Sequence, residues 1–336
     1  MKYISIPKNN GYLFNQPDSA YYLASQEYDF AQSKGLENWK AMALTLQGIS
    51  LSVRGKNSEA INSFEKALHL HRILADNKGV AQSLLSLGTA NLKKGNLINA
   101  INYYNESLLL ADKNFLKPEI YKNLSNLGLI YDNLEEYDKA LDYYEQSLNL
   151  IEKDKPEHKN MIMLNIGVIY SAQKKYKEAI DVYNECLTFF ESVQDKVRLG
   201  KCLNNMGHTS TEMGDILRAT IYYKRSLTLS SETANNQQKA LSLLGLSEIY
   251  FDQGKIDSAL TCAKRAIAIS KKIGSLKYIQ NAANQNYLIY KNTGNDAMSL
   301  EMLELSIMAK DSLRKDDARI ELTRQELNYK YEKKKI

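Results

Sequence analysis

Residues 124–147 read LSNLGLIYDNLEEYDKALDYYEQS, and their spacing decides the fold. Leu124, Gly128 and Tyr131 lie four and three residues apart, which places them on one face of a helix. After a polar turn the same spacing returns in a second set of three, Ala140, Tyr144 and Ser147. The stretch therefore predicts two amphipathic helices joined by a short turn.

The same columns return along most of the chain with a period of about 40 residues. The glycine column reads Gly48, Gly88, Gly128, Gly167 and Gly207, then Ser247 and Tyr287. Twelve residues after each lies a small residue, namely Ala60, Ala100, Ala140, Ala179, Ala219, Ala259 and Ser299. Four residues further the column reads Phe64, Tyr104, Tyr144, Tyr183, Tyr223, Ala263 and Leu303. These coincident columns predict about seven helical hairpins.

A glycine inside a helix costs about 1 kcal/mol relative to alanine, so the glycine column needs a structural reason. We expect the second helix of each hairpin to approach the first closely there, with the aromatic residue filling the space beside the glycine. Turn glycines are expected in the left-handed conformation at Gly55, Gly95, Gly214 and Gly254. We expect N-caps of the second helices at Asn57, Asn96, Asp138 and Asp257.

The pattern LG-x-x-Y followed by A-x-x-x-Y-x-x-S resembles the tetratricopeptide repeat, and the match extends from residue 18 to about residue 310. The period of about 40 resembles the longer-helix variety of kinesin light chains, cell-polarity adaptors and bacterial peptide-sensing regulators. The resemblance implies an all-α fold, a right-handed α-α superhelix of about seven hairpins plus a C-terminal helix. It also implies a binding module, not an enzyme.

Three segments are expected: an N-terminal tail over residues 1–17, the repeat solenoid over 18–310 and a helical extension over 311–336. The solenoid begins with a lone second helix, because Asp18, Ala20 and Ala24 match the start of a second helix 40 residues before Ala60. In the extension, Leu313, Ile320 and Leu327 are seven apart. That spacing fits a coiled-coil seam through which the chain dimerises, and it also fits a helix that caps the last hairpin.

The extension also resembles the segment that follows the repeats in Bacteroidetes-type membrane histidine kinases and helix-turn-helix regulators. That resemblance implies the sensor region of a signalling protein, periplasmic in that case and cytoplasmic otherwise. The alternative is a scaffold that assembles with its own copies through the last helix.

Several classes of function lack support in the sequence. Lysine and arginine are scattered among nearly as many acids, for a net charge of +5, so we expect no nucleic-acid partner. No apolar run approaches the roughly 18 residues of a membrane span. The three cysteines and four histidines show neither metal-ligand spacing nor a catalytic motif. We therefore expect no cofactor, no metal and no catalytic site.

The expected binding face is the side of the first helices that points away from the second helices. Two residues before the glycine column lie Asn126, Asn165 and Asn205, and an amide can donate and accept at once along a peptide backbone. The alternative is that these amides bond to neighbouring helices. Further members of the face are Lys122, Lys201, Leu129, Val168 and His208. Lysines beside apolar residues suggest a peptide or protein ligand with apolar side chains and some negative charge.

Overall fold

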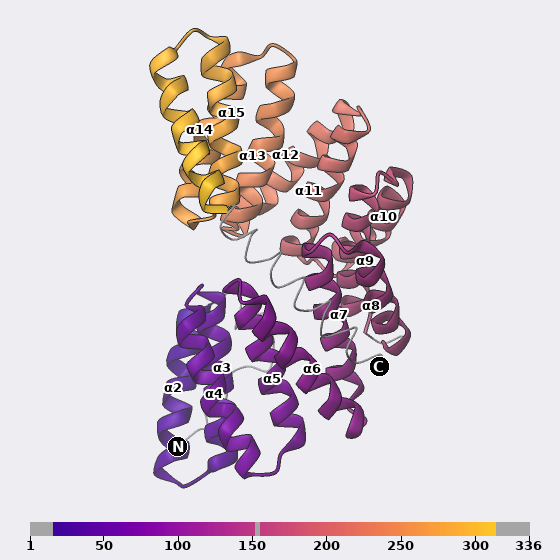
Figure 1. The fold of residues 1–336 in the computed structure, drawn as a ribbon, viewed down its shortest axis with the longest axis vertical. Helices are drawn as coiled ribbons and strands as arrows, with labels where there is room; N and C mark the ends of the chain where they lie inside the picture. Colours follow the sequence, from indigo (N-terminus) through magenta and orange to yellow (C-terminus); the bar gives the residue numbers. More distant parts are fainter. Residues whose placement is uncertain (1–15, 152–154, 314–336) are drawn as a thin grey trace. The chain divides into compact units, whose positions relative to one another are not determined.

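The computed structural model describes residues 16–151 and 155–313, and in these residues every regular element is a helix (Figure 1). The chain divides into two compact units at Lys155 and Pro156. Unit 1 contains α2 (Pro17–Ser33), α3 (Glu37–Val53), α4 (Asn57–Ile73), α5 (Asn77–Lys93), α6 (Leu97–Lys113), α7 (Lys117–Asn133) and α8 (Tyr137–Leu150).

Unit 2 continues the alternation of first and second helices. It contains α9 (Pro156–Ala172), α10 (Tyr176–Ser192), α11 (Lys196–Glu212), α12 (Ile216–Glu232), α13 (Asn236–Asp252), α14 (Ile256–Ile273) and α15 (Leu276–Asn292). Residues 296–313 form one more second helix. None of the helices in the described part of the chain is long and apolar enough to cross a membrane.

Each helix packs against the next one within its unit, and the first helices also contact one another from hairpin to hairpin. In unit 1 these contacts join α3 to α5 and α5 to α7, and in unit 2 they join α9, α11, α13 and α15. The first helices therefore form a continuous layer in each unit, as the expected binding face requires.

The predicted contact between each column glycine and the aromatic ring of the second helix is confirmed. A Cβ atom on Gly88 would lie 2.5 Å from the ring of Tyr104, and one on Gly167 would lie 2.4 Å from the ring of Tyr183. These distances are shorter than any van der Waals contact, so the ring occupies the place of the missing side chain. In the sixth hairpin Ser247 replaces the glycine, Ala263 replaces the ring, and the serine hydroxyl donates to the Ala259 carbonyl at 2.9 Å.

The small residue three positions after the aromatic one links the two helices of a hairpin. The Ser107 hydroxyl donates to the Ala81 carbonyl at 2.8 Å, and Ser147 and Ser226 make the same bond to Tyr121 and Gly200. Cys186 occupies this place in the fourth hairpin, and its thiol donates to the Asn160 carbonyl at 3.4 Å. Each of these bonds satisfies a hydroxyl or thiol that the packing removes from water.

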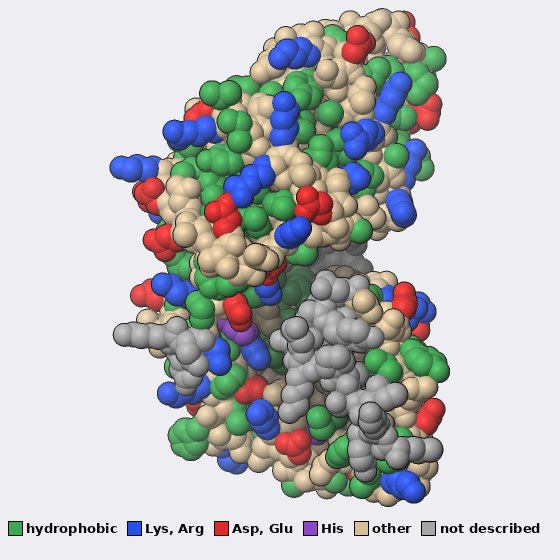
Figure 2. Space-filling model, turned by 180° about the vertical axis from the view of Figure 1, so that it is seen from behind, with side chains coloured by type: hydrophobic (Ala, Val, Ile, Leu, Met, Phe, Trp, Pro, Cys, Tyr) green, Lys and Arg blue, Asp and Glu red, His purple; other side chains and the backbone are tan. Residues whose placement is uncertain are grey.

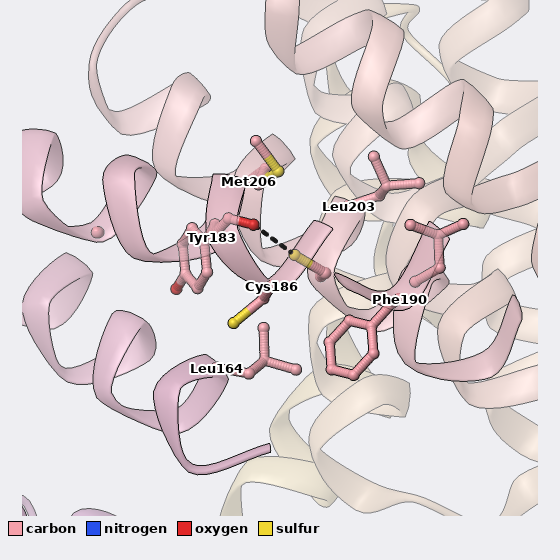
Figure 3. Packing of buried hydrophobic residues seen from close by; sticks show 9 residues of the cluster. Leu164, Tyr183, Cys186, Phe190, Leu203 and Met206 are labelled. Atoms are coloured by element: carbon pink, nitrogen blue, oxygen red, sulfur yellow. Dashed lines mark hydrogen bonds between the residues drawn. The ribbon is translucent and has the colours of Figure 1, made fainter. Parts of the chain in front are cut away.

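Figure 3 shows the core of the fourth hairpin, where Leu164, Tyr183 and Phe190 pack against Leu203 and Met206 of α11. Cys186 lies among them, and the Cys202 thiol donates to the Tyr183 carbonyl at 3.4 Å. Burial raises the pKa of the Cys186 thiol to about 12. All three cysteines are buried and free, and they pack as small apolar residues.

The turns confirm one expectation and correct another. Gly55, Gly95, Gly214 and Gly254 all have positive φ. The N-cap prediction is confirmed in position at Asn96, which caps α6 without a side-chain bond, and is wrong at Asn57, Asp138 and Asp257, which lie inside the first turn of their helices. The caps that bond through side chains are Asp76, Asp195, Asp215, Asn235 and Asn295. Four of these five follow the turn between two hairpins or open the last second helix, whereas the sequence pattern predicted caps at four other second helices.

Candidate functional site

Of the eight residues expected on the binding face, five lie in unit 2 and three in unit 1, and each set is described within its own unit. All eight are at least partly exposed in the structure. In unit 2 the face is formed by α9, α11 and α13. Its members are Asn165, Val168, Lys201, Asn205 and His208.

Lys201 and Asn165 are brought together from neighbouring first helices. The Lys201 ammonium on α11 donates to Asn165 Oδ1 on α9 at 3.4 Å. The bond is long for a charge-assisted one and lies at the surface, so it is weak. Asn165 thus contacts a neighbouring helix, in line with the alternative interpretation, while its Nδ2 group has no bond within the described residues.

The Asn205 side chain makes no hydrogen bond among the described residues. Its Nδ2 atom is buried and lacks an acceptor among the described residues. One hairpin later the amide column stops at Gly245, because a Cβ atom there would lie 2.3 Å from the ring of Tyr223. Tyr223 also fills the space beside Gly207, so one ring packs against glycines of two successive first helices.

The C-terminal ends of α11 and α13 make the same face acidic, which the sequence pattern did not predict. Glu248 is exposed, yet the protein atoms around its carboxyl partly desolvate it, and this desolvation, followed by the charges of Asp252 and Glu212, raises the pKa of the carboxyl. Glu248 lies one residue after the repeat position, as Val168 and His208 do, and Glu212 and Asp252 lie five residues after it. Reading that last column across the repeats would have found the pair. The face of unit 2 therefore carries Lys201 near one end and three carboxylates near the other.

In unit 1 the corresponding face is formed by α7 with α5. Lys122, Asn126 and Leu129 are partly exposed on α7. Beside them the Gln82 side chain on α5 donates to Glu119 Oε1 at 2.7 Å, and Glu119 is 2% exposed. The Asn126 side chain makes no hydrogen bond among the described residues, so its amide is available to a ligand.

His71 has a structural role, whereas His208 lies exposed on the candidate face. His71 is buried, and its Nδ1 atom lies 2.9 Å from Asp76 Oδ2, while the other oxygen of Asp76 accepts from the Gly79 amide and caps α5. His69, two residues away, is exposed and does not face it. Across the described ranges no group of three or more histidine, cysteine, aspartate or glutamate side chains could hold a metal ion.

Charged side chains of both signs are mixed on the surface. On the face that Figure 2 shows, lysine and arginine alternate with aspartate and glutamate and with apolar patches. This view contains none of the concentrated basic stripes on which a nucleic-acid backbone would lie.

Two curated relatives are similar to parts of the chain. The photosystem I assembly protein Ycf3 of Acaryochloris marina (strain MBIC 11017) is 44% identical over 63 residues, which are 19% of this chain and 36% of that protein. Ycf3 of Rippkaea orientalis (strain PCC 8801 / RF-1) is 26% identical over 129 residues, 34% of this chain and 69% of that protein. The chain thus spans about a third of the length of the first relative.

Solved structures share the fold at low identity. The apo form of the quorum sensor NprR from B. thuringiensis has a TM-score of 0.68 at 14% identity, over 87% of this chain and 83% of that one. A Rap protein complexed with competence and sporulation factor has a TM-score of 0.67 at 13% identity, over 91% and 96%. The apo form of RapI has a TM-score of 0.64 at 18% identity, over 82% and 99%.

Family models of the tetratricopeptide repeat match residues 45–116, 119–192 and 201–272. These matches cover most of the hairpins whose glycine, aromatic and small-residue contacts are described above. The chain belongs to the tetratricopeptide repeat family.

Proposed function

We propose that this module for binding proteins or peptides holds an extended peptide on the first-helix face of unit 2, between Asn165 and Asn205. The observation that carries the proposal is the pair of amides on adjacent first helices, one touched by Lys201 and the other uncommitted. The Asn165 Nδ2 group can donate to a peptide backbone whatever the peptide's side chains, whereas the buried Nδ2 group of the partly exposed Asn205 does so only after its side chain turns. The fold likeness to the quorum sensor NprR and to a Rap protein in complex with a signalling factor supports the same class of ligand.

The charged residues at the two ends of the face favour ligand groups of opposite charge. Lys201 favours a carboxylate, and the carboxylates of Glu212, Glu248 and Asp252 favour a cationic group at the opposite end. The raised pKa of Glu248 gives the cationic end a pH dependence. Because this carboxyl protonates at a higher pH than usual, affinity for a cationic ligand falls as the pH drops through that raised value. A Glu248→Gln variant should bind more weakly at neutral pH and lose that part of the pH dependence.

The test uses peptides selected on the whole chain from a random library. Affinity is measured by fluorescence anisotropy for the unaltered chain, for Asn165→Ala with Asn205→Ala, and for the control Asn184→Ala on the exposed side of α10. The double variant should lose about tenfold or more, since each lost hydrogen bond contributes about 0.5–1.5 kcal/mol. The control should bind within twofold of the unaltered chain. Equal affinities with unchanged helical circular dichroism would remove the amides from the site.

We also propose that the chain serves as the sensor region of a signalling protein, as the resemblance of its C-terminal extension implies. Ligand binding on α9, α11 and α13 would then change the last helix, residues 296–313. Hydrogen exchange of amides in that helix, with and without a selected peptide, tests the idea. Protection that does not change at saturating peptide contradicts it.

One observation favours self-assembly as a second function. Met302 and Ala309 lie buried on the second helix of the last hairpin, and Leu313 follows on the same face of that helix. The Ser306 hydroxyl donates to the Gln280 carbonyl at 3.5 Å, and α15 begins only four residues earlier, at Leu276. α15 therefore extends only about one helical turn beyond the level of Ser306. Ile320 and Leu327, which lie outside the described residues, continue this stripe by sequence spacing.

Sedimentation of the chain with and without residues 314–336 tests the assembly. A dimer that becomes a monomer on truncation supports contact between two copies through the extension. A monomer in both cases contradicts it.

A further inference from the structure

A hollow of about 420 Å³ lies in unit 1 between two second helices, α2 and α4, with α3 as its floor. It is separate from the candidate peptide site, which lies on first helices in unit 2. Leu44, Leu70 and the ring of Tyr28 supply its apolar surface. Pockets that hold small organic molecules have volumes of about 300–1,000 Å³ and combine an apolar lining with a few polar groups.

The polar groups of this pocket are mainly donors. Lys40, Lys66, His69 and Asn62 line it, with Glu65 as the one acid on its wall. The Lys40 ammonium lies 5.8 Å from the centre of the Tyr28 ring, and its side chain is 20% exposed. It also lies 3.6 Å from a Glu37 carboxylate oxygen, a distance that leaves the ammonium room for a further acceptor.

The repeat shows that Lys66 lacks a counter-charge that the same position has in two other pairs of neighbouring second helices. In unit 1 an ion pair of 2.8 Å joins the second helices α4 and α6 through Arg72 and Glu106. In unit 2 the same two repeat positions are held by Glu191 and Arg225, with the charges exchanged. Lys66 stands at the position of Glu106, and the residue at the position of Arg72, forty residues earlier, is the neutral Gln32.

No ion pair between α2 and α4 takes its place in the part of the chain that the structure describes, and Lys66 makes none there. The groove between α2 and α4 therefore presents an ammonium group where the grooves between α4 and α6 and between α10 and α12 present an ion pair. An uncompensated lysine beside a second lysine and an apolar floor favours an anion with an apolar body.

We propose that the pocket between α2 and α4 binds a small organic carboxylate, whose charged group lies between Lys40 and Lys66 and whose apolar part rests on Leu44 and Tyr28. The chemistry could be presented by a free acid or by the carboxyl terminus of a peptide that ends in an apolar residue. Both sources present the same chemistry, a carboxylate attached to an apolar body. The experiment separates the two sources.

Isothermal titration of the full chain uses 3-phenylpropionate, its neutral analogue 3-phenylpropanol, and the peptide acetyl-Gly-Gly-Phe with a free carboxyl terminus. We expect the acid to bind at least tenfold more tightly than the alcohol. The double variant Lys40→Met with Lys66→Met should lose that preference. The matched control removes two exposed lysines of unit 2, Lys177→Met with Lys224→Met, and should keep it.

Three results overturn the proposal: equal binding of acid and alcohol, no binding of either carboxylate up to 10 mM (about 2.7 kcal/mol of binding free energy), or equal losses in the two double variants. If the peptide binds more tightly than the free acid, the source is a chain terminus, and the reverse order identifies a free metabolite. Neither result depends on the peptide face of unit 2, because the Asn165→Ala and Asn205→Ala variants should bind 3-phenylpropionate unchanged.

Discussion

At the residue scale, this fold rests on glycines whose missing side chains make room for rings. Two glycines of α11 show that the surroundings, and not the residue type, decide the effect. A Cβ atom on Gly207 would lie 2.8 Å from the ring of Tyr223, which is 6% exposed. A Cβ atom on Gly200 would meet nothing closer than 3.8 Å.

Alanine substitutions at these two glycines should therefore have opposite signs. Gly200→Ala gains helix propensity and should stabilise the chain by up to about 1 kcal/mol. Gly207→Ala forces a buried ring to move and should destabilise it by about 1–3 kcal/mol, less that same gain. Urea denaturation followed by circular dichroism measures both. A stabilising Gly207→Ala would contradict the packing argument.

The sixth hairpin indicates how a side chain can be accommodated at the glycine position. The sixth hairpin pairs Ser247 with Ala263 where the others pair glycine with an aromatic ring. In a double-mutant cycle, Gly207→Ala should cost less when Tyr223→Ala is already present, because the clash is then gone. Additive free energies would show that the two side chains do not interact.

At the element scale, the turns hold left-handed residues that are often not glycine. Ala75, Phe115, Gln194 and Ala234 have φ between 52° and 55° at the turns between hairpins. Gly35 and Gly274 take the matching conformation at two other such turns, with φ of 65° and 67°. The left-handed conformation costs an L-residue about 1–2 kcal/mol, so these turns are strained where glycine is absent.

Replacing the strained alanine by glycine should stabilise the chain. Ala234→Gly relieves about 1–2 kcal/mol of strain and gives back about 0.5–1 kcal/mol through a more flexible unfolded chain, for a small net gain. The matched control is the reverse change, Gly274→Ala, which should destabilise the chain by a similar amount. Thermal denaturation measures both, and a lower Tm for Ala234→Gly would contradict the strain.

At the scale of the whole molecule, each hairpin is stabilised by its neighbours, as in other repeat proteins. The lone helix α2 covers the first complete hairpin of unit 1: its Ala20, Ala24 and Ala31 are fully buried. Leu44 and Leu51 of α3 are 5% and 3% exposed beneath it. Removing α2 would return these two leucines to water at about 1.5–3 kcal/mol each.

Deleting residues 1–36 should therefore lower the stability of unit 1 by about 3 kcal/mol or more. Peptide affinity on the face of unit 2 should stay within twofold, because no residue of that face belongs to α2. Hydrogen exchange resolves the two units: protection should fall in α3 and α4 and persist in α11 and α13. Equal loss of protection in both units would show that the repeats do not act locally.

The repeat columns predict which residues form the candidate site. They do not predict which of those residues touch one another. Columns identify residues that share a place on the first helices, as Asn165 and Asn205 do in one column and Lys201 does in another. They do not reveal that Lys201 reaches Asn165, nor that Glu248 stands near Glu212. Each of these two relations joins side chains 36 residues apart, whose distance depends on how two helices pack.

The sequence by itself determined the hairpins of this protein, the close contact of glycine with an aromatic ring, and the left-handed turn glycines. These features repeat because each depends on residues close together in the chain, and periodicity makes such local patterns visible. The tertiary structure alone decided the division into two units, the place of Tyr223 between Gly207 and Gly245, and the open pocket beside Lys66. These depend on which side chains meet across neighbouring helices, and the chemistry of one column does not specify its partner in another.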